Sequence, residues 1–396
     1  MFSSRTNWHL ENNRLTQALE EHRRSGRELF DLTASNPTTC GFNYPQSEIL
    51  AALADPRALV YRPESKGLPE ARQAIAAYYA GCGSFAKAVP SVDPERIILT
   101  SGTSEAYSHI FRLLCEPGDE ILAPEPSYPL FEFLADLADI RLVPYPLLYD
   151  HGWQIDFNSL RAALSPRSRA VLVVHPNNPT GSLVHPREAA ELMEICAARE
   201  MAVVADEVFL DYASAAAPSF VSCDQALTFT LSGISKISLL PQMKLAWTVV
   251  SGPQALANAA VDRLEIIADT YLSPGTPVQL ALPELLSLRR TLQSQVRDRI
   301  HANLSALDEV LSETKTVSRL VRESGWYAIL KVPVTATDDE LVVALLTRHS
   351  VLVHPGHFFN FDRDGFLVLS LITPEPEFKA GLRRLQEFFG DGMHGG

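Results

Sequence analysis

The sequence has few basic residues and no long apolar run. Lysine and arginine total 34 against 47 acidic residues, which gives a formal net charge of −13, and no basic cluster occurs along the 396 residues. Such a chain would repel an extended phosphate backbone. Nowhere do eighteen apolar residues follow one another, and no apolar stretch follows a basic start at the N-terminus. We therefore expect a cytoplasmic protein that binds neither nucleic acid nor membranes.

Cysteine is scarce, and neither repeats nor low-complexity linkers occur. The odd number of cysteines and their scattered spacing, with no CxxC or metal-type pattern, predict reduced, unpaired thiols and no metal site. The five are Cys40, Cys82, Cys115, Cys196 and Cys223. What the chain does have is a hydrophobic fraction of 46% and a charged fraction of 20%, as in globular proteins. At this length we expect more than one domain.

The middle of the chain alternates short β-branched runs with helical stretches. This alternation is typical of βαβ units and predicts an α/β fold with a mainly parallel sheet. We expect strands at residues 96–100, 120–123, 141–144, 170–175, 201–205, 227–231 and 246–251, and helices at 104–115 and 186–199.

The last third changes character. Apolar residues recur at three- and four-residue steps and predict two long helices, and the remainder mixes strands with helices as a small α+β domain does. The helices are at 254–269 and 277–313, and later elements are expected at 326–332, 338–348, 351–354, 366–370 and 377–389. We predict an N-terminal segment (1–45) that packs with the small domain through a helix (7–24) and a strand (30–34), a large domain (46–290) and a small C-terminal domain (291–396).

A polar turn follows the first predicted strand of the sheet. Ser101, Gly102 and Thr103 lie between this strand and a helix. Glycine allows close approach, hydroxyl groups donate hydrogen bonds, and the free amides of a helix N-terminus attract an anion. The turn is a candidate phosphate site. The alternative is that its hydroxyl groups only cap the helix.

Two further polar groups follow strands of the same sheet. Asn178 lies between two prolines, which stiffen its loop and could hold the amide as a donor toward a ligand oxygen. An ordinary turn is the alternative. Asp206 ends the strand at 201–205, where a carboxylate could pair with a cationic ring nitrogen or could cap the next helix.

Lys236 is one of only seven lysines and has apolar neighbours, among them Leu231, Ile234 and Ile237. Loss of hydration lowers the pKa of a lysine, and an unprotonated amine is what Schiff-base chemistry needs. The alternative is a lysine whose amine extends back to solvent. Five groups now follow one another along the sequence: the candidate phosphate site, the aromatic Tyr128, and the amide, acid and amine of Asn178, Asp206 and Lys236. Pyridoxal 5′-phosphate needs each of them.

The chain resembles the class I/II aminotransferases, which are fold type I pyridoxal phosphate-dependent enzymes, over almost its whole length. The resemblance rests on Tyr61 with Gly67-Leu68-Pro69, and on residues 100–106, 177–181, 206–208 and 235–236. It implies a large domain with a mostly parallel sheet, a small α+β domain and the pyridoxal phosphate cofactor. It also implies transfer of an amino group from an amino donor to a 2-oxo acid.

The same resemblance implies roles for individual residues. Lys236 would form the Schiff base and move the proton, Asp206 would pair with the pyridinium, and Asn178 would bond the ring hydroxyl. Tyr128 would stack on the ring. Ser101, Gly102, Thr103 and Ser235 would hold the phosphate. Tyr61 would reach the phosphate of the partner subunit, which implies a homodimer with shared active sites.

Three positions depart from the family pattern. Phe209 replaces the tyrosine expected three residues after the aspartate, and Lys244 replaces an arginine on the phosphate. Val368 stands where the family has the arginine that binds the substrate carboxylate. Arg363 or Arg62 could substitute for it, or both could be solvated loop charges.

Two other functions use the same cofactor. A lyase or decarboxylase would share the fold and the lysine, because the bond that breaks depends on substrate orientation. A non-catalytic pyridoxal phosphate sensor fused to a DNA-binding regulator is disfavoured, since residues 1–44 contain no helix-turn-helix pattern and the net charge is negative.

Overall fold

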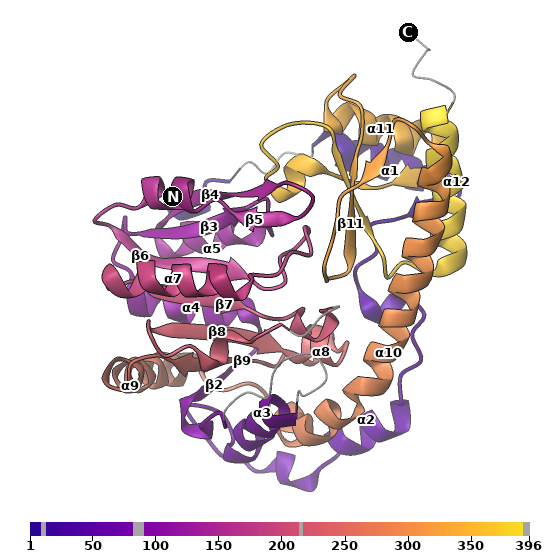
Figure 1. Ribbon diagram of the computed structural model, residues 1–396. Coiled ribbons are helices and arrows are strands. Elements are labelled where there is room, and N and C mark those ends of the chain that lie inside the picture. Colours follow the sequence, from indigo (N-terminus) through magenta and orange to yellow (C-terminus); the bar gives the residue numbers. More distant parts are fainter. Residues whose placement is uncertain (9–12, 82–90, 214–216, 391–396) are drawn as a thin grey trace.

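A computed structural model describes residues 1–8, 13–81, 91–213 and 217–390 (Figure 1). The large domain is built on an eight-stranded sheet whose central strands, β8 to β4, are parallel, whereas β9 and β5 run antiparallel to their neighbours. In spatial order the strands are β2 (Ile97–Thr100), β9 (Ala246–Ser251), β8 (Thr228–Gly233), β7 (Ala202–Asp206), β6 (Ser168–Val174), β3 (Glu120–Glu125), β4 (Arg141–Tyr149) and β5 (Trp153–Ile155). The predicted α/β class and the predicted strands are confirmed, with ends shifted by a few residues.

Helices cover both faces of this sheet. The strands alternate buried apolar residues toward each face, so each face needs a cover. One face packs against α4 (Thr103–Leu114), α5 (Leu130–Ala138) and α9 (Gln254–Tyr271). The other packs against α6 (Phe157–Ala163), α7 (Pro186–Ala198) and, near β2 and β9, α3 (Pro69–Gly81). Helices α3, α5 and α6 and the short α2 (Gln46–Leu53) and α8 (Ile234–Ile237) were not among the expected elements.

Helix α10 (Thr276–Glu313) runs from the large domain into the small domain (Figure 1). The small domain has an antiparallel sheet in the order β10 (Ser318–Arg319), β11 (Tyr327–Lys331), β14 (Phe366–Ser370) and β13 (His354–Pro355), with α11 (Asp338–His349) and α12 (Glu375–Gly390) packed against it. The predicted domain boundary at residue 290 falls inside α10, and the boundaries stay predictions.

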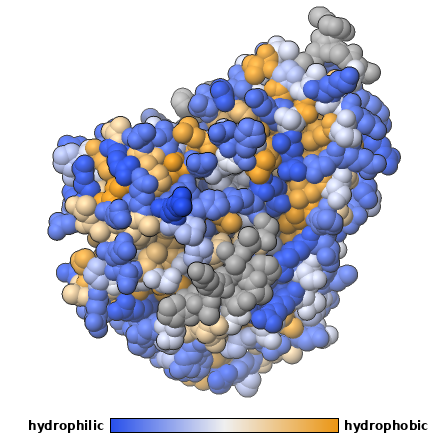
Figure 2. All heavy atoms as spheres, in the orientation of Figure 1, coloured by the Kyte–Doolittle hydropathy of each residue, from blue (hydrophilic) through white to orange (hydrophobic). Residues whose placement is uncertain are grey.

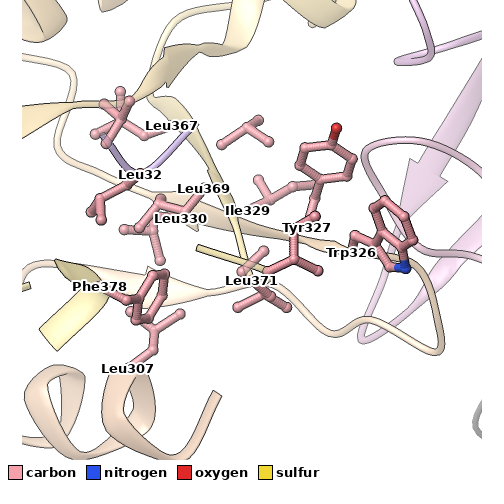
Figure 3. Close-up of a cluster of buried hydrophobic side chains, with 14 of the residues drawn as sticks. Leu32, Leu307, Trp326, Tyr327, Ile329, Leu330, Leu367, Leu369, Leu371 and Phe378 are labelled. Carbon is pink, nitrogen blue, oxygen red and sulfur yellow. The ribbon is translucent and has the colours of Figure 1, made fainter. Parts of the chain in front are cut away.

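The N-terminal segment joins the small domain. Strand β1 (Phe30–Asp31) pairs in parallel with β12 (Val351–Leu352), so the expected strand at 351–354 is split between two sheets. Figure 3 shows Leu32 from this segment among Leu307 of α10, Phe378 of α12 and Leu369 of β14. The expected helix from residue 7 is wrong at its start: α1 spans Arg14–Arg24, and Asn13 caps it. Residues 9–12 of that prediction lie outside the described part.

Other properties agree with a folded chain that has a polar exterior. Figure 2 shows a largely hydrophilic face with smaller apolar patches. Within the described residues, no helix is both long enough and apolar enough to cross a membrane. Four cysteines are free, as predicted, and burial raises the pKa of Cys40 to about 11 and that of Cys196 to about 12. Cys82 lies outside the described residues.

Candidate active site

A pocket of about 190 Å³ lies at the carboxyl ends of the parallel strands, where ligands of open α/β sheets bind. Large-domain loops meet the small domain here, because Ser35 and Tyr327 complete its wall. Six of the residues predicted from the sequence line it together: Thr103, Tyr128, Asn178, Asp206, Ser235 and Lys236.

Lys236 lies on the short helix α8, directly after β8. Burial lowers the pKa of its amine to about 8, and the Asp206 carboxylate opposes that change. The amine lies against two aromatic rings, with Nζ 5.4 Å from the centre of Phe209 and 4.8 Å from that of Trp326. Tyr212 donates a hydrogen bond of 2.8 Å from its hydroxyl group to the Lys236 carbonyl oxygen and so holds its backbone. The lysine is the buried, partly neutral amine that its neighbours in sequence predicted.

Asp206 ends β7 and is buried. Its carboxylate accepts hydrogen bonds from the Tyr107 hydroxyl group (2.9 Å) and the Val208 amide (3.1 Å). Burial raises its pKa, while these two hydrogen bonds and Lys236 act against the rise. A buried carboxylate held in this way can accept a hydrogen bond from a protonated ring nitrogen and stabilise its charge.

Two adjacent asparagines have different surroundings. Asn177 is occupied within the protein: its Nδ2 donates to the Pro126 carbonyl oxygen and to Thr180 Oγ1, each at 2.9 Å, and its Oδ1 accepts from Ser127 Oγ. Asn178 lines the pocket, and its buried Oδ1 has no hydrogen-bond partner among the described residues. Asn177 therefore shapes the loop, and Asn178 is available to a ligand.

The predicted phosphate end lies at the N-terminus of α4. Gly102 is the N-cap, and nothing described lies within 4 Å of where a Cβ would stand. Thr103 and Ser235 line the pocket, whereas the Ser101 amide donates to Glu105 Oε2 at 2.6 Å and is occupied in this structure. The polar groups around the pocket fit pyridoxal phosphate. They are hydroxyl groups and helix amides for the phosphate, and an amine, a carboxylate and a side-chain amide for the ring.

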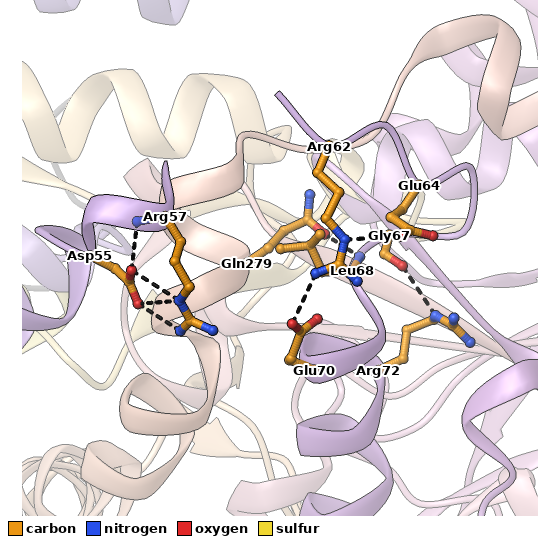
Figure 4. Close-up of polar contacts among 9 residues, drawn as sticks. All are labelled: Asp55, Arg57, Arg62, Glu64, Gly67, Leu68, Glu70, Arg72 and Gln279. Carbon is orange, nitrogen blue, oxygen red and sulfur yellow. Dashed lines mark hydrogen bonds and ion pairs between the residues drawn. The ribbon is translucent and has the colours of Figure 1, made fainter. Parts of the chain in front are cut away.

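Six predicted site residues lie outside this lining: Ser101 and Gly102 at the start of α4, and Lys244, Tyr61, Arg62 and Arg363 farther away. Lys244 is exposed after β8, and Tyr61 is 79% exposed. Arg62 is paired with Glu64 (3.2 Å) and Glu70 (3.1 Å), as Figure 4 shows.

Arg363 lines a separate groove of about 670 Å³ between β4 and the small domain, and its side chain is 73% exposed. Val368 is fully buried in β14, between Ile329 and His354 of the neighbouring strands, and offers no cation. Arg62 and Arg363 as carboxylate-binding residues stay predictions.

The sequence analysis missed two residues that line the pocket, Ser35 and Tyr327, and two that contact its lining, Tyr107 beside Asp206 and Trp326 beside Lys236. Tyr107 follows Thr103 by one helical turn on α4, a spacing that could have revealed it. Ser35, Tyr327 and Trp326 come from distant segments, and no local pattern marks them.

Comparison with known proteins identifies the family. A family model described as aminotransferase class I and II matches residues 27–385. The glutamate-pyruvate aminotransferase AlaA of Escherichia coli is 27% identical over 357 residues, which is 87% of each chain. An alanine aminotransferase of Mycobacterium tuberculosis is 27% identical over 375 residues, 92% of this chain and 86% of the relative.

Solved structures agree in fold. An aminotransferase from Escherichia coli superposes with a TM-score of 0.85 at 25% identity and covers 100% of this chain and 99% of its own. The alanine aminotransferase from Pyrococcus furiosus has a TM-score of 0.88 at 24% identity, and the superposition covers 99% of this chain and 100% of that one. The fold, the pocket and the match along most of the sequence agree, and the chain belongs to the class I and II aminotransferase family.

Proposed function

We propose that this aminotransferase holds pyridoxal 5′-phosphate on Lys236 and moves an amino group between an amino acid and a 2-oxo acid. The observation that carries the proposal is the buried Lys236 amine beside the buried Asp206 carboxylate in one pocket. An amine with a pKa of about 8 is unprotonated in roughly a tenth of the molecules at pH 7, far more than an ordinary lysine. It can act as a nucleophile and can accept a proton.

Each residue then has a definite task. Bound pyridoxal phosphate supplies an electron sink for the bond broken at the substrate carbon. Lys236 would hold the cofactor covalently and move a proton at Nζ, and Asp206 would keep a proton on the ring nitrogen.

The other pocket residues bind and orient the cofactor. Asn178 would form a hydrogen bond with the ring hydroxyl, and Tyr128 would stack on the ring. Thr103 and Ser235 would bind the phosphate, and Ser101, Gly102 and Lys244 would complete its surroundings.

The names of the relatives suggest which substrates to try first. Alanine and glutamate as donors, with pyruvate and 2-oxoglutarate as acceptors, form the starting panel. Conversion of the cofactor spectrum to the amine form, with a matching amount of 2-oxo acid released, would support amino transfer. Release of carbon dioxide or ammonia instead would identify a decarboxylase or a lyase.

The first prediction concerns the lysine itself. Borohydride reduction of the protein loaded with cofactor, followed by peptide mapping, should label Lys236 alone, because it is the buried amine in the pocket. The variant Lys236→Ala should take no label. A label on Lys244 in the native protein would contradict the assignment.

We further propose a homodimer, supported by an exposed apolar surface. The segment at 59–66 lies beside the end of α9: Ser65 donates to Glu265 at 2.6 Å, and Ser273 donates to the Glu64 carbonyl oxygen at 2.6 Å. Exposed apolar side chains gather on these two adjacent segments, namely Leu59 (91%), Val60 (65%), Tyr61 (79%), Ile266 (70%) and Leu272 (64%). A second copy of the chain would cover them, and Tyr61 would then reach the partner's phosphate site. A cytoplasmic location stays a prediction of the composition, which cell fractionation would test.

A further inference from the structure

The loop that leads into β11, residues 320–326, carries three buried donors without a partner. Arg322 Nε, Ser324 Oγ and Trp326 Nε1 make no hydrogen bond to any described residue. Ser324 is 1% exposed and Trp326 is fully buried. A buried donor without an acceptor is unfavourable, so three such donors on one loop make it a candidate site for an acceptor.

Arg322 adds a charge to this loop. Its Nη2 donates to the Gly325 carbonyl oxygen at 2.6 Å, but no carboxylate of the described residues forms an ion pair with it. The neighbouring Glu323 is turned toward the large domain, where it accepts from the Leu183 amide and lies 3.2 Å from His185. Burial, with a smaller contribution from Arg319, lowers the pKa of Arg322 to about 10, so the guanidinium is still charged at neutral pH. A buried cation without an anion is costly, which points to an anionic ligand.

The loop leads directly to Tyr327, which lines the active-site pocket. At one end, the Trp326 ring lies 4.8 Å from Lys236 Nζ and packs edge-to-face on Phe209. At the other end, the Glu323 amide donates to the Gly181 carbonyl oxygen at 3.2 Å, and a Cβ on Gly181 would lie 3.3 Å from Arg322 Cβ. Gly181 ends the turn that begins at Asn177. The loop thus extends from the reactive amine to the turn that carries Asn178.

We propose that this loop binds the carboxylate of the amino-acid substrate, with Arg322 as the cation and the Trp326 N–H and Ser324 hydroxyl group as further donors. The proposal rests on amino transfer at Lys236. A carboxylate is the anion that an amino acid and a 2-oxo acid share, and guanidinium is well suited to bind it. The loop would supply the charge that the fully buried Val368 lacks.

The test compares substrates that differ only in the carboxylate. In Arg322→Gln, the kcat/KM for an amino acid such as phenylalanine should fall by roughly 30- to 1000-fold, as after loss of one partner of a buried charge pair. The half-reaction with phenylethylamine, which has no carboxylate, should stay within about threefold of native. Arg319→Gln is the matched control, because Arg319 ends β10 directly before the loop but is paired with Asp308.

Further variants keep the outcome decisive if Arg322→Gln folds poorly. Trp326→Phe keeps a ring and removes the N–H, so it should weaken binding of the unreactive carboxylate 3-phenylpropionate, followed by the cofactor spectrum, by about three- to twentyfold. Borohydride labelling of Lys236 should be unchanged in both variants. Native affinity for the carboxylate in both variants, or a selective loss in Arg363→Gln or Arg62→Gln instead, would overturn the proposal. Absence of Lys236 labelling in the native protein would refute the proposed function, not the role of the loop.

Discussion

Lys236 and Asp206 are two ionisable groups that the fold buries side by side. Burial lowers the pKa of the amine and raises that of the acid, and their mutual attraction opposes both changes. Tyr107 and the Val208 amide stabilise the charged carboxylate. The amine stays chemically available because burial outweighs the attraction.

The pH dependence of this amine follows from its pKa. In protein freed of cofactor, the rate at which a trace acylating reagent modifies Lys236 should rise with a midpoint near pH 8, since only the neutral amine reacts. Asp206→Asn should move the midpoint to lower pH, because the charge that helps to retain the proton is removed. Peptide mass spectrometry at a series of pH values measures both midpoints. A midpoint near the ordinary value of 10.5, or a shift to higher pH in the variant, would contradict this account.

At the scale of elements, the turn from Asn177 to Gly181 connects the two domains. Gly181 has φ +66°, and a Cβ there would overlap the Ser324 carbonyl oxygen. Glycine is therefore required both by the backbone conformation and by the close approach of the loop at 320–326. The position of Asn178 relative to this loop depends on that contact.

A pair of glycine variants separates the two requirements. Gly26 has nearly the same φ, +67°, with nothing within 4 Å of its Cβ position. Gly26→Ala should cost about 1 kcal/mol, the usual penalty of a left-handed residue, and should lower the Tm slightly. Gly181→Ala carries the same penalty plus the overlap, so its Tm should fall clearly further. Equal Tm values, measured by thermal unfolding under the same conditions, would show that the loop at 320–326 moves away from the new Cβ without loss of stability.

At the scale of the whole molecule, each active site draws on distant parts of the chain. The N-terminal segment supplies Ser35, the large domain supplies Lys236, and the small domain supplies Tyr327. Helix α10 joins the two domains as one continuous element (Figure 1). A homodimer would add a segment of the partner to each site.

Subunit mixing tests the shared site. If Tyr61→Phe and Lys236→Ala are each inactive alone, a heterodimer contains one site with both native residues. Random exchange of equal amounts should restore about a quarter of native activity, because half of the dimers are mixed and half of their sites are intact. Native mass spectrometry checks that exchange has occurred. Persistent inactivity of fully exchanged mixtures would refute the partner role of Tyr61.

Much of this protein could be predicted from its sequence by itself. The alternation of β-branched runs and helices indicates the α/β class, because sheet and helix periodicities are local properties. Lys236 was found from its apolar neighbours, and Asp206 and Asn178 from their places after strands, since parallel strands bring their carboxyl ends to one edge. The ordered set then indicated the cofactor.

Only the tertiary structure determined which residues surround Lys236, Asp206 and Asn178. Ser35 and Tyr327 reach the pocket, and Trp326 reaches Lys236, through packing of segments that lie far apart in the chain. The sequence likewise does not show that Arg322 forms no ion pair with any described residue, because Glu323 next to it is a plausible partner until the fold turns that carboxylate toward His185. Local spacing determines which residues share an element, whereas the packing of elements determines which charges meet.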